Sequence, residues 1–210
     1  MRRGVFLSRD GVINENRSEY VKSWDEFRFL PGALASLARL ARSPFAIVVL
    51  SNQSAINRGL VSRSEVDAIN GRMVRQVEAH GGRIDGVYVC PHRPDEGCSC
   101  RKPEPGLLHQ AAAELAIDLN SSYLVGDALD DMQAGLKSRC IPLLVLTGRG
   151  QEEVARAQEA GVVDFVYFSA LPQVVDFILS MPIDQVTRQP AAPQRSRLSG
   201  AKQARQGKDA

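Results

Sequence analysis

The sequence predicts a single α/β domain built on a doubly wound, mainly parallel sheet. Five short apolar runs have the length and residue types of buried strands, and near-continuous apolar strands are typical of parallel sheets covered on both faces. These runs are residues 4–8, 45–51, 86–90, 122–126 and 141–146. Amphipathic segments alternate with them, which predicts a Rossmann-like arrangement. A length of 210 residues with 44% apolar positions is enough for one sizeable core.

Three segments between the runs have the apolar spacing of amphipathic helices. They cover residues 34–41, 66–77 and 107–115. The second follows a Ser62-x-x-Glu65 capping box, and the third is entered through Pro103 and Pro105, so both have the start signals of helices.

Charge is distributed unevenly along the chain. The formal net charge is +2, but residues 184–210 hold six Lys or Arg against two Asp or Glu. The preceding part holds 20 basic and 22 acidic residues and carries −2, so it has no nucleic-acid-binding signature and no such partner is expected. We therefore expect one domain over residues 1–183 and a disordered basic tail, poor in apolar residues, over 184–210.

The N-terminal region lacks the pattern of an export signal. The apolar run after Arg2 and Arg3 covers only residues 5–7, and no run approaches the length of a membrane span. We expect a cytoplasmic, monomeric protein with no membrane partner. In that compartment the four cysteines favour metal binding or free thiols over disulfides.

Polar residues follow four of the predicted strands where each strand ends. The segments are Ser8-Arg9-Asp10-Gly11, Ser51-Asn52-Gln53-Ser54, Cys90-Pro91-His92 and Gly126-Asp127-Ala128-Leu129-Asp130-Asp131. Taken singly, each can be a turn, a helix cap or a pair of acids favoured in a first helical turn. Ligands of such sheets bind outside the carboxyl ends of the strands, so we expect these side chains to meet at one rim.

The third of these segments continues into a metal-binding pattern. It supplies three thiols and an imidazole, the ligand set of a closed tetrahedral zinc site, from Cys90, His92, Cys98 and Cys100. A disulfide or unligated loop residues are the alternatives, and zinc is favoured over both. Its expected role is structural, because four metal bonds would fix a loop with little to bury and aim Arg101 and Lys102 into the rim.

The order of these motifs resembles the haloacid dehalogenase superfamily of phosphotransferases. Within it, FLSRDGVIN, VVLSNQSAINRG, CSCRKPEPGLL and YLVGDALDDMQAG resemble the FLDRDGxIN, TNQSGIARG, CxCRKPxPGxL and VGDxxxDMxA segments of the heptose bisphosphate phosphatase family, over about residues 5–180. The related histidinol-phosphate phosphatases share the zinc loop but typically have NQDG after the second strand. The segment from Gln53 to Gly59 therefore favours the heptose family.

The resemblance implies a haloacid dehalogenase fold and a role for each residue at the rim. Asp10 would be the general acid and base, and Mg²⁺ would be held by Asp10 and Asp127 with support from Asp131 and position 8. The implied substrate-binding residues are Ser51, Asn52, Gln53, Arg58, Arg101 and Lys102. This combination of acidic, basic and hydroxyl side chains suits phosphoryl transfer, because a metal cation, a lysine and fixed hydrogen-bond donors must stabilise the negative charge on the phosphoryl oxygens. No interval between motifs can hold a large cap domain, so loops 14–30, 52–61 and 90–103 would recognise a small phosphosugar.

Ser8 stands where the family has its nucleophilic aspartate. A carboxylate there attacks phosphorus as an anion and adds charge around Mg²⁺, whereas a serine hydroxyl is unionised at neutral pH. The expected function is a Mg²⁺-dependent sugar-phosphate phosphatase acting on the 7-phosphate of heptose 1,7-bisphosphate, with slow turnover. Histidinol-phosphate hydrolysis and phosphosugar binding without turnover are the alternatives.

Overall fold

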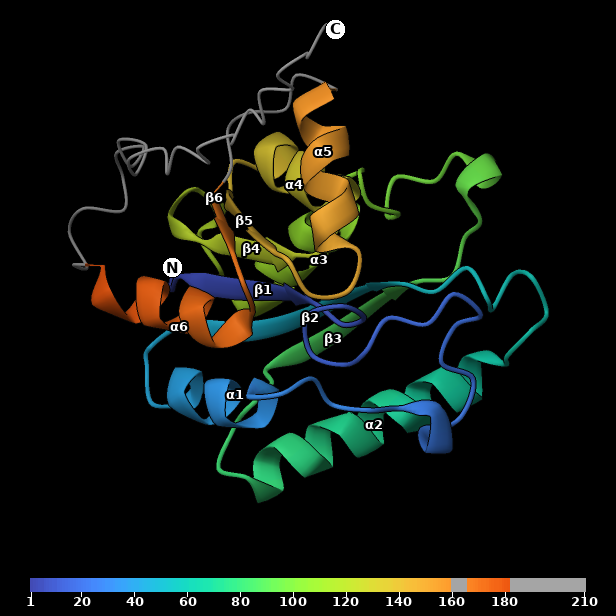
Figure 1. The fold of residues 1–210 in the computed structure, drawn as a ribbon, viewed down its shortest axis with the longest axis horizontal. Coiled ribbons are helices and arrows are strands. Elements are labelled where there is room, and N and C mark those ends of the chain that lie inside the picture. The colour runs from blue at the N-terminus through green and yellow to red at the C-terminus, as the bar shows by residue number, and fades with distance from the viewer. Residues whose placement is uncertain (160–165, 182–210) are drawn as a thin grey trace, which may run out of the picture.

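The computed structural model describes residues 1–159 and 166–181, and a six-stranded parallel sheet lies at its centre (Figure 1). The strand order is β3-β2-β1-β4-β5-β6. The strands are β1 (Gly4–Ser8), β2 (Ala46–Asn52), β3 (Gly86–Cys90), β4 (Tyr123–Gly126), β5 (Ile141–Val145) and β6 (Val166–Phe168). The predicted doubly wound sheet is confirmed, and β6 is an addition to the five expected strands. The expected tail over 184–210 lies outside the described residues.

Helices cover both faces of the sheet. In Figure 1, α1 (Ala33–Ala41), α2 (Arg63–Ala79) and α6 (Leu171–Ser180) lie below it, and α3 (Gly106–Leu115), α4 (Leu129–Ser138) and α5 (Gly150–Glu159) lie above it. Successive residues of a strand point to opposite faces. In β1, Val5 and Leu7 accordingly join the core between the sheet and α1, α2 and α6, whereas Phe6 joins the core between the sheet and α3 and α4. Both faces of β1 are therefore buried, as its unbroken apolar run predicts.

The start of α2 agrees with the sequence. Ser62 is the N-cap, its hydroxyl accepts a hydrogen bond from the Glu65 amide at 3.1 Å, and the Glu65 carboxylate accepts one from the Ser62 amide at 2.9 Å. This capping box satisfies two donors at the helix end.

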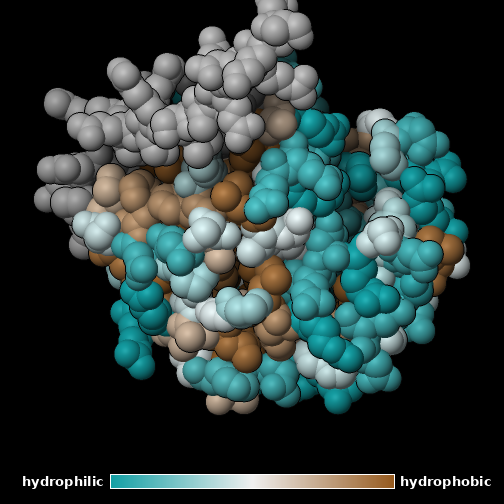
Figure 2. Space-filling model, viewed as in Figure 1, coloured by the Kyte–Doolittle hydropathy of each residue, from teal (hydrophilic) through white to brown (hydrophobic). Residues whose placement is uncertain are grey.

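The strand order reverses between β1 and β4, and their carboxyl ends mark the switch point where ligands bind in doubly wound sheets. The longest described stretch without α-helix or strand covers residues 9–32 and begins at this point. Its only helical element is a short 3-10 helix at Trp24–Glu26. This stretch therefore holds no cap domain. Figure 2 shows a mostly hydrophilic surface over the loops at this edge, on the right of the view.

Among the described residues, no helix combines the length and the apolar character needed to cross a bilayer.

Candidate active site at the carboxyl edge of the sheet

A cavity of about 290 Å³ opens at the switch point. It is lined by Ser8, Asp10, Asn16, Arg17, Ser18, Tyr20, Val21, Ser51, Asn52, Gln53, Ser54, Arg101, Lys102, Asp127, Ala128, Asp130, Asp131 and Arg149. The structure thus brings together predicted rim residues of the segments after β1, β2 and β4 with Arg101 and Lys102, whereas the segment Cys90-Pro91-His92 is absent from the lining. Arg58 differs from the others, because it is exposed and does not line the cavity.

The floor of the cavity is formed by Ser8 and a buried lysine. Lys102 is 3% exposed. Its ammonium donates to Ser8 Oγ at 3.0 Å and to the Leu50 carbonyl at 3.4 Å. Its charge is met by an ion pair with Asp131, which is equally buried. A buried ammonium with its donors fixed in this way is preorganised for the oxygens of a phosphoryl group.

The side chain of Asn52 determines where Lys102 lies. Its amide nitrogen donates to the Lys102 carbonyl at 3.0 Å, and its amide oxygen accepts from the Lys102 amide at 3.1 Å. The backbone amide of the neighbouring Gln53 donates to the Cys90 carbonyl at 2.7 Å. The end of β2 is therefore tied to the cysteine-rich loop on both sides. Asn52 was expected to bind substrate, and its amide is engaged here with the backbone of Lys102.

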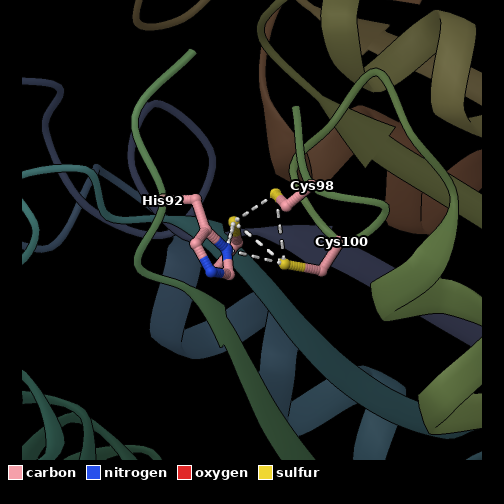
Figure 3. A group of neighbouring side chains, drawn as sticks. His92, Cys98 and Cys100 are labelled. Carbon is pink, nitrogen blue, oxygen red and sulfur yellow. Dashed lines mark hydrogen bonds between the residues drawn. The ribbon is translucent and has the colours of Figure 1, made fainter. Parts of the chain in front are cut away.

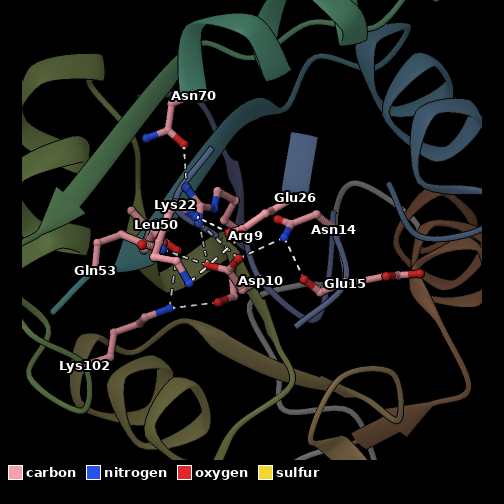
Figure 4. Close-up of polar contacts among 12 residues, drawn as sticks. Arg9, Asp10, Asn14, Glu15, Lys22, Glu26, Leu50, Gln53, Asn70 and Lys102 are labelled. Atoms are coloured by element: carbon pink, nitrogen blue, oxygen red, sulfur yellow. Dashed lines mark hydrogen bonds and ion pairs between the residues drawn. The ribbon is translucent and has the colours of Figure 1, made fainter. Parts of the chain in front are cut away.

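Asp10 lies at the centre of a set of donors (Figure 4). Its carboxylate accepts from the Arg9 guanidinium at 3.0 Å, from Asn14 Nδ2 at 2.9 Å and from Gln53 Nε2 at 2.8 Å. Burial raises the pKa of Asp10, but the charge of Arg9 and these hydrogen bonds outweigh it, so the net pKa is lowered. Asp10 is consequently ionised at neutral pH in the free protein.

The guanidinium that holds Asp10 is itself fully buried. Arg9 has no exposed surface, and its second terminal nitrogen donates to Asn70 Oδ1 on α2 at 3.0 Å. A buried charge requires a partner and hydrogen bonds, and Asp10 and Asn70 supply them. No local pattern indicates this role, because Arg9 lies between two candidate site residues and Asn70 lies inside a helix.

Asp127 follows β4 and is 3% exposed. Burial, reinforced by the negative charge of Asp131, raises its pKa to about 7, and a hydrogen bond from the Arg149 amide at 3.0 Å opposes the rise. A side chain at Gly11 would come within 2.0 Å of the Asp127 carboxylate, so only glycine permits this close approach of the β1 loop. A hard divalent cation would relieve the unfavourable charge of Asp127, so the site fits Mg²⁺.

The predicted zinc ligands come together in one cluster at and after the end of β3 (Figure 3). Their four ligand atoms lie within 4.8 Å of one another, and the three sulfurs are 3.2 to 3.7 Å apart. The His92 Nδ1 atom lies 3.5 Å from Cys90 Sγ and 3.2 Å from Cys100 Sγ. Zinc bonds of about 2.3 Å to sulfur and about 2.0 Å to nitrogen place tetrahedral ligands roughly 3.5 to 3.8 Å apart. The cluster can hold a metal, and its cysteines form no disulfide.

Several lining residues were not singled out from the sequence. They are Asn16, Arg17, Ser18, Tyr20, Val21 and Arg149. Arg149 follows β5, so the rule that ligands bind beyond strand ends identifies its loop as a candidate. Arg17 and Tyr20 lie in the loop over residues 14–30, which was expected to recognise the phosphosugar, and they line the cavity. Nothing local identified these two residues within the loop, because its path over the cavity depends on tertiary packing.

Comparison with known proteins identifies relatives of this chain in sequence and in structure. The HAD-hydrolase-like family model matches residues 99–167. A D-glycero-beta-D-manno-heptose-1,7-bisphosphate 7-phosphatase of Bordetella bronchiseptica is 41% identical over 152 residues, which cover 72% of this chain and 85% of the relative. The enzyme of the same name from Pseudomonas aeruginosa is 36% identical, covering 77% and 90%.

Two solved structures resemble the fold. The crystal structure of D,D-heptose 1,7-bisphosphate phosphatase from B. bronchiseptica, complexed with magnesium and phosphate, is similar with a TM-score of 0.80 and 38% identity, covering 84% of this chain and 98% of that one. The corresponding enzyme from Burkholderia thailandensis is similar with a TM-score of 0.67 and 34% identity, covering 86% and 100%.

Proposed function

We propose that this chain, which belongs to the D-glycero-beta-D-manno-heptose-1,7-bisphosphate 7-phosphatase family, is a slow phosphatase. It binds a heptose 1,7-bisphosphate and hydrolyses the 7-phosphate of this sugar slowly. The family consists of phosphoric monoester hydrolases, and this chain is one by descent. The observation that carries the proposal is the cavity floor, where the Lys102 ammonium donates a hydrogen bond to Ser8 Oγ at 3.0 Å. The 7-phosphate would occupy this floor, with Ser51 and Lys102 donating to its oxygens.

Slow turnover follows from the states of two groups. The Ser8 hydroxyl has no negative charge, and its oxygen already accepts a hydrogen bond from Lys102. Asp10 is held ionised by Arg9, Asn14 and Gln53, so it lacks the proton that a leaving sugar oxygen needs. The nucleophile position therefore lacks an anion, and the acid position lacks a proton. Protonation of Asp10 has to accompany substrate binding before the bond to the leaving oxygen can break.

Two metals are proposed for this chain. Mg²⁺ would be held by the Asp127 carboxylate and the Asp10 backbone carbonyl, and it would neutralise charge on the phosphoryl oxygens. The Mg²⁺ site of this chain would have one carboxylate ligand fewer than the family motif implies, because Ser8 replaces an aspartate. Zinc would be held by Cys90, His92, Cys98 and Cys100 as a structural ion.

The choice of sugar rests on the relatives. The reported relatives are named for the heptose bisphosphate, which supports that substrate, in its beta form, over histidinol phosphate. The cytoplasmic location and the monomeric state expected from the sequence stay predictions.

The test is phosphate release from D-glycero-beta-D-manno-heptose 1,7-bisphosphate with Mg²⁺, comparing the unmodified chain, Ser8→Ala and Ser8→Asp. Calorimetry should show that the unmodified chain binds the bisphosphate. Ser8→Asp should raise turnover by several orders of magnitude, because the covalent step regains its anion. Ser8→Ala should be as slow as the unmodified chain, and adding Asp10→Asn to Ser8→Asp should remove most of the gain. Turnover of the unmodified chain at an ordinary rate of about 1 to 10³ per second would refute the slow-turnover part, and absence of binding would refute the whole proposal.

A further inference from the structure

Arg17 places a positive charge at the mouth of the cavity. Its side chain lines the cavity and is 45% exposed, whereas the Lys102 side chain at the floor is 4% exposed. The two cations therefore lie at different depths of one cavity. A ligand with two anionic groups can meet both, and a ligand with one such group can occupy the floor alone.

The charge of Arg17 is weakly engaged within the described part of the chain. Its nearest carboxylate is that of Glu26, and the shortest nitrogen–oxygen distance is 4.0 Å, at the outer limit of an ion pair. Glu26 is occupied by Lys22, whose amide donates to it at 2.9 Å and whose ammonium lies 3.8 Å away. An exposed pair at this distance is worth little. Arg17 is consequently available for a ligand.

Two other cations of the lining, Lys102 and Arg101, are engaged more closely. Lys102 has its ion pair with Asp131. The Arg101 guanidinium donates to the His92 carbonyl at 3.1 Å, which ties it to the cysteine-rich loop. Positive charge on Arg149 stabilises the ionised form of Asp127. Within the described residues, Arg17 differs from Lys102 and Arg101 in having only a distant partner.

The loop around Arg17 is held over the cavity by Tyr20. The Tyr20 amide donates to the Arg17 carbonyl at 3.2 Å, which closes a turn, and the Tyr20 hydroxyl lies 3.0 Å from Ser54 Oγ on the loop after β2. Tyr20 has a φ of 64°, a left-handed backbone conformation that is unfavourable for a non-glycine residue. Val21 next to it is 1% exposed and anchors the loop in the core. This strained and anchored turn fixes where Arg17 enters the mouth.

We propose that Arg17 binds the second phosphate of the bisphosphate, the one that is not transferred, and thereby selects bisphosphates over monophosphates. The inference rests on the proposed function, which places the transferred phosphate at Ser8 and Lys102. A guanidinium suits this role because its planar fork binds phosphate with two parallel hydrogen bonds. Asn16 and Ser18 flank Arg17 in the lining and add neutral donors. Arg58, which the resemblance implied as a substrate-binding residue, lies outside the lining.

The experiment is calorimetric titration of the full-length chain with heptose 1,7-bisphosphate and with heptose 7-phosphate, which lacks the second phosphate. The variants are Arg17→Gln, Arg17→Lys and the matched control Arg28→Gln. Arg28 is exposed on the same loop, does not line the cavity, and donates to the adjacent Phe27 carbonyl. If a ligand is hydrolysed during the titration, the same comparison is made on KM.

Arg17→Gln should weaken bisphosphate binding at least tenfold and leave 7-phosphate binding within twofold. Arg17→Lys should recover part of the loss, and Arg28→Gln should leave both affinities within twofold. An equal loss for both ligands, or no loss of bisphosphate affinity, would overturn the inference while the proposed function stands. If the unmodified chain bound neither ligand, the proposed function would fail and the inference with it.

Discussion

Replacing Asp127 by asparagine should stabilise the metal-free protein at alkaline pH. Burial and the charge of Asp131 raise the pKa of Asp127 to about 7 from an ordinary value of 3.8. A carboxyl group with a raised pKa binds its proton more tightly in the folded state than in the unfolded one. Its ionisation therefore costs folding free energy as the pH rises from about 4 to about 7, and the full cost is present above pH 7.

The size of this cost follows from the pKa difference. Each pKa unit corresponds to about 1.4 kcal/mol, so the upper limit for Asp127 is roughly 4 kcal/mol at pH 8 and below 2 kcal/mol at pH 5. The carboxyl group is 3% exposed, so solvent screening reduces the value little. Asparagine at this position keeps an oxygen that can accept from the Arg149 amide, and it has no charge to bury. Asp127→Asn should therefore raise the free energy of unfolding, more at pH 8 than at pH 5.

The assay is urea unfolding in buffer without added divalent cations, at pH 5 and pH 8. Asp118→Asn is the control, because hydrogen bonds led by that from the Ser121 hydroxyl lower the pKa of Asp118, so its ionised form stabilises the fold and the variant should lose stability at pH 8. Added Mg²⁺ should stabilise the unmodified chain at pH 8 and leave Asp127→Asn nearly unchanged. The reasoning is refuted if Asp127→Asn is no more stable than the unmodified chain at pH 8, or if its advantage is the same at both pH values.

Two further predictions concern the parts that hold Lys102. Freshly purified protein should contain about one zinc per chain by elemental analysis, and Cys98→Ser should lose it and weaken phosphate binding; protein without zinc, or unchanged binding in the variant, would contradict this. Asn52→Ala removes both hydrogen bonds to the Lys102 backbone and should lower the free energy of unfolding by about 1 to 3 kcal/mol. It should also weaken inorganic phosphate binding severalfold, and unchanged binding would show that Lys102 is placed without the clamp.

The parts of the fold that follow from local pattern were predictable. Unbroken apolar runs identify β1 and β2 because strands buried on both faces cannot alternate with polar residues. The capping box at Ser62 fixes the start of α2. The cluster of Cys90, His92, Cys98 and Cys100 was predictable because Cys and His at such short spacing are typical of metal sites. The three-residue strand β6 was missed because so short a run has no detectable period.

The parts of the site that depend on long-range packing were not predictable. Arg9 follows an apolar run and precedes an acid, and nothing local shows that it is buried against Asn70, 61 residues away. Arg58 was placed in the site by its motif, and the fold turns it toward solvent. Arg17 enters the cavity because Tyr20 bonds to Ser54, 34 residues away. In each case a contact distant in sequence decides whether a charge faces the ligand.

Serine at position 8 has a consequence for the fold as well as for catalysis. Asp127 and Asp131 already share a buried site, in which burial and then the charge of Asp131 raise the pKa of Asp127. The ion pair of Lys102 with Asp131 compensates this charge at the floor. An aspartate at position 8 would add a further carboxylate beside Lys102, and part of its charge would stay uncompensated until a cation bound. The serine hydroxyl removes that repulsion and still accepts from Lys102. Restoring the carboxylate should therefore raise turnover and lower stability in metal-free buffer, with Mg²⁺ recovering the loss. Activity and metal-free stability oppose each other at this residue because both depend on the same negative charge.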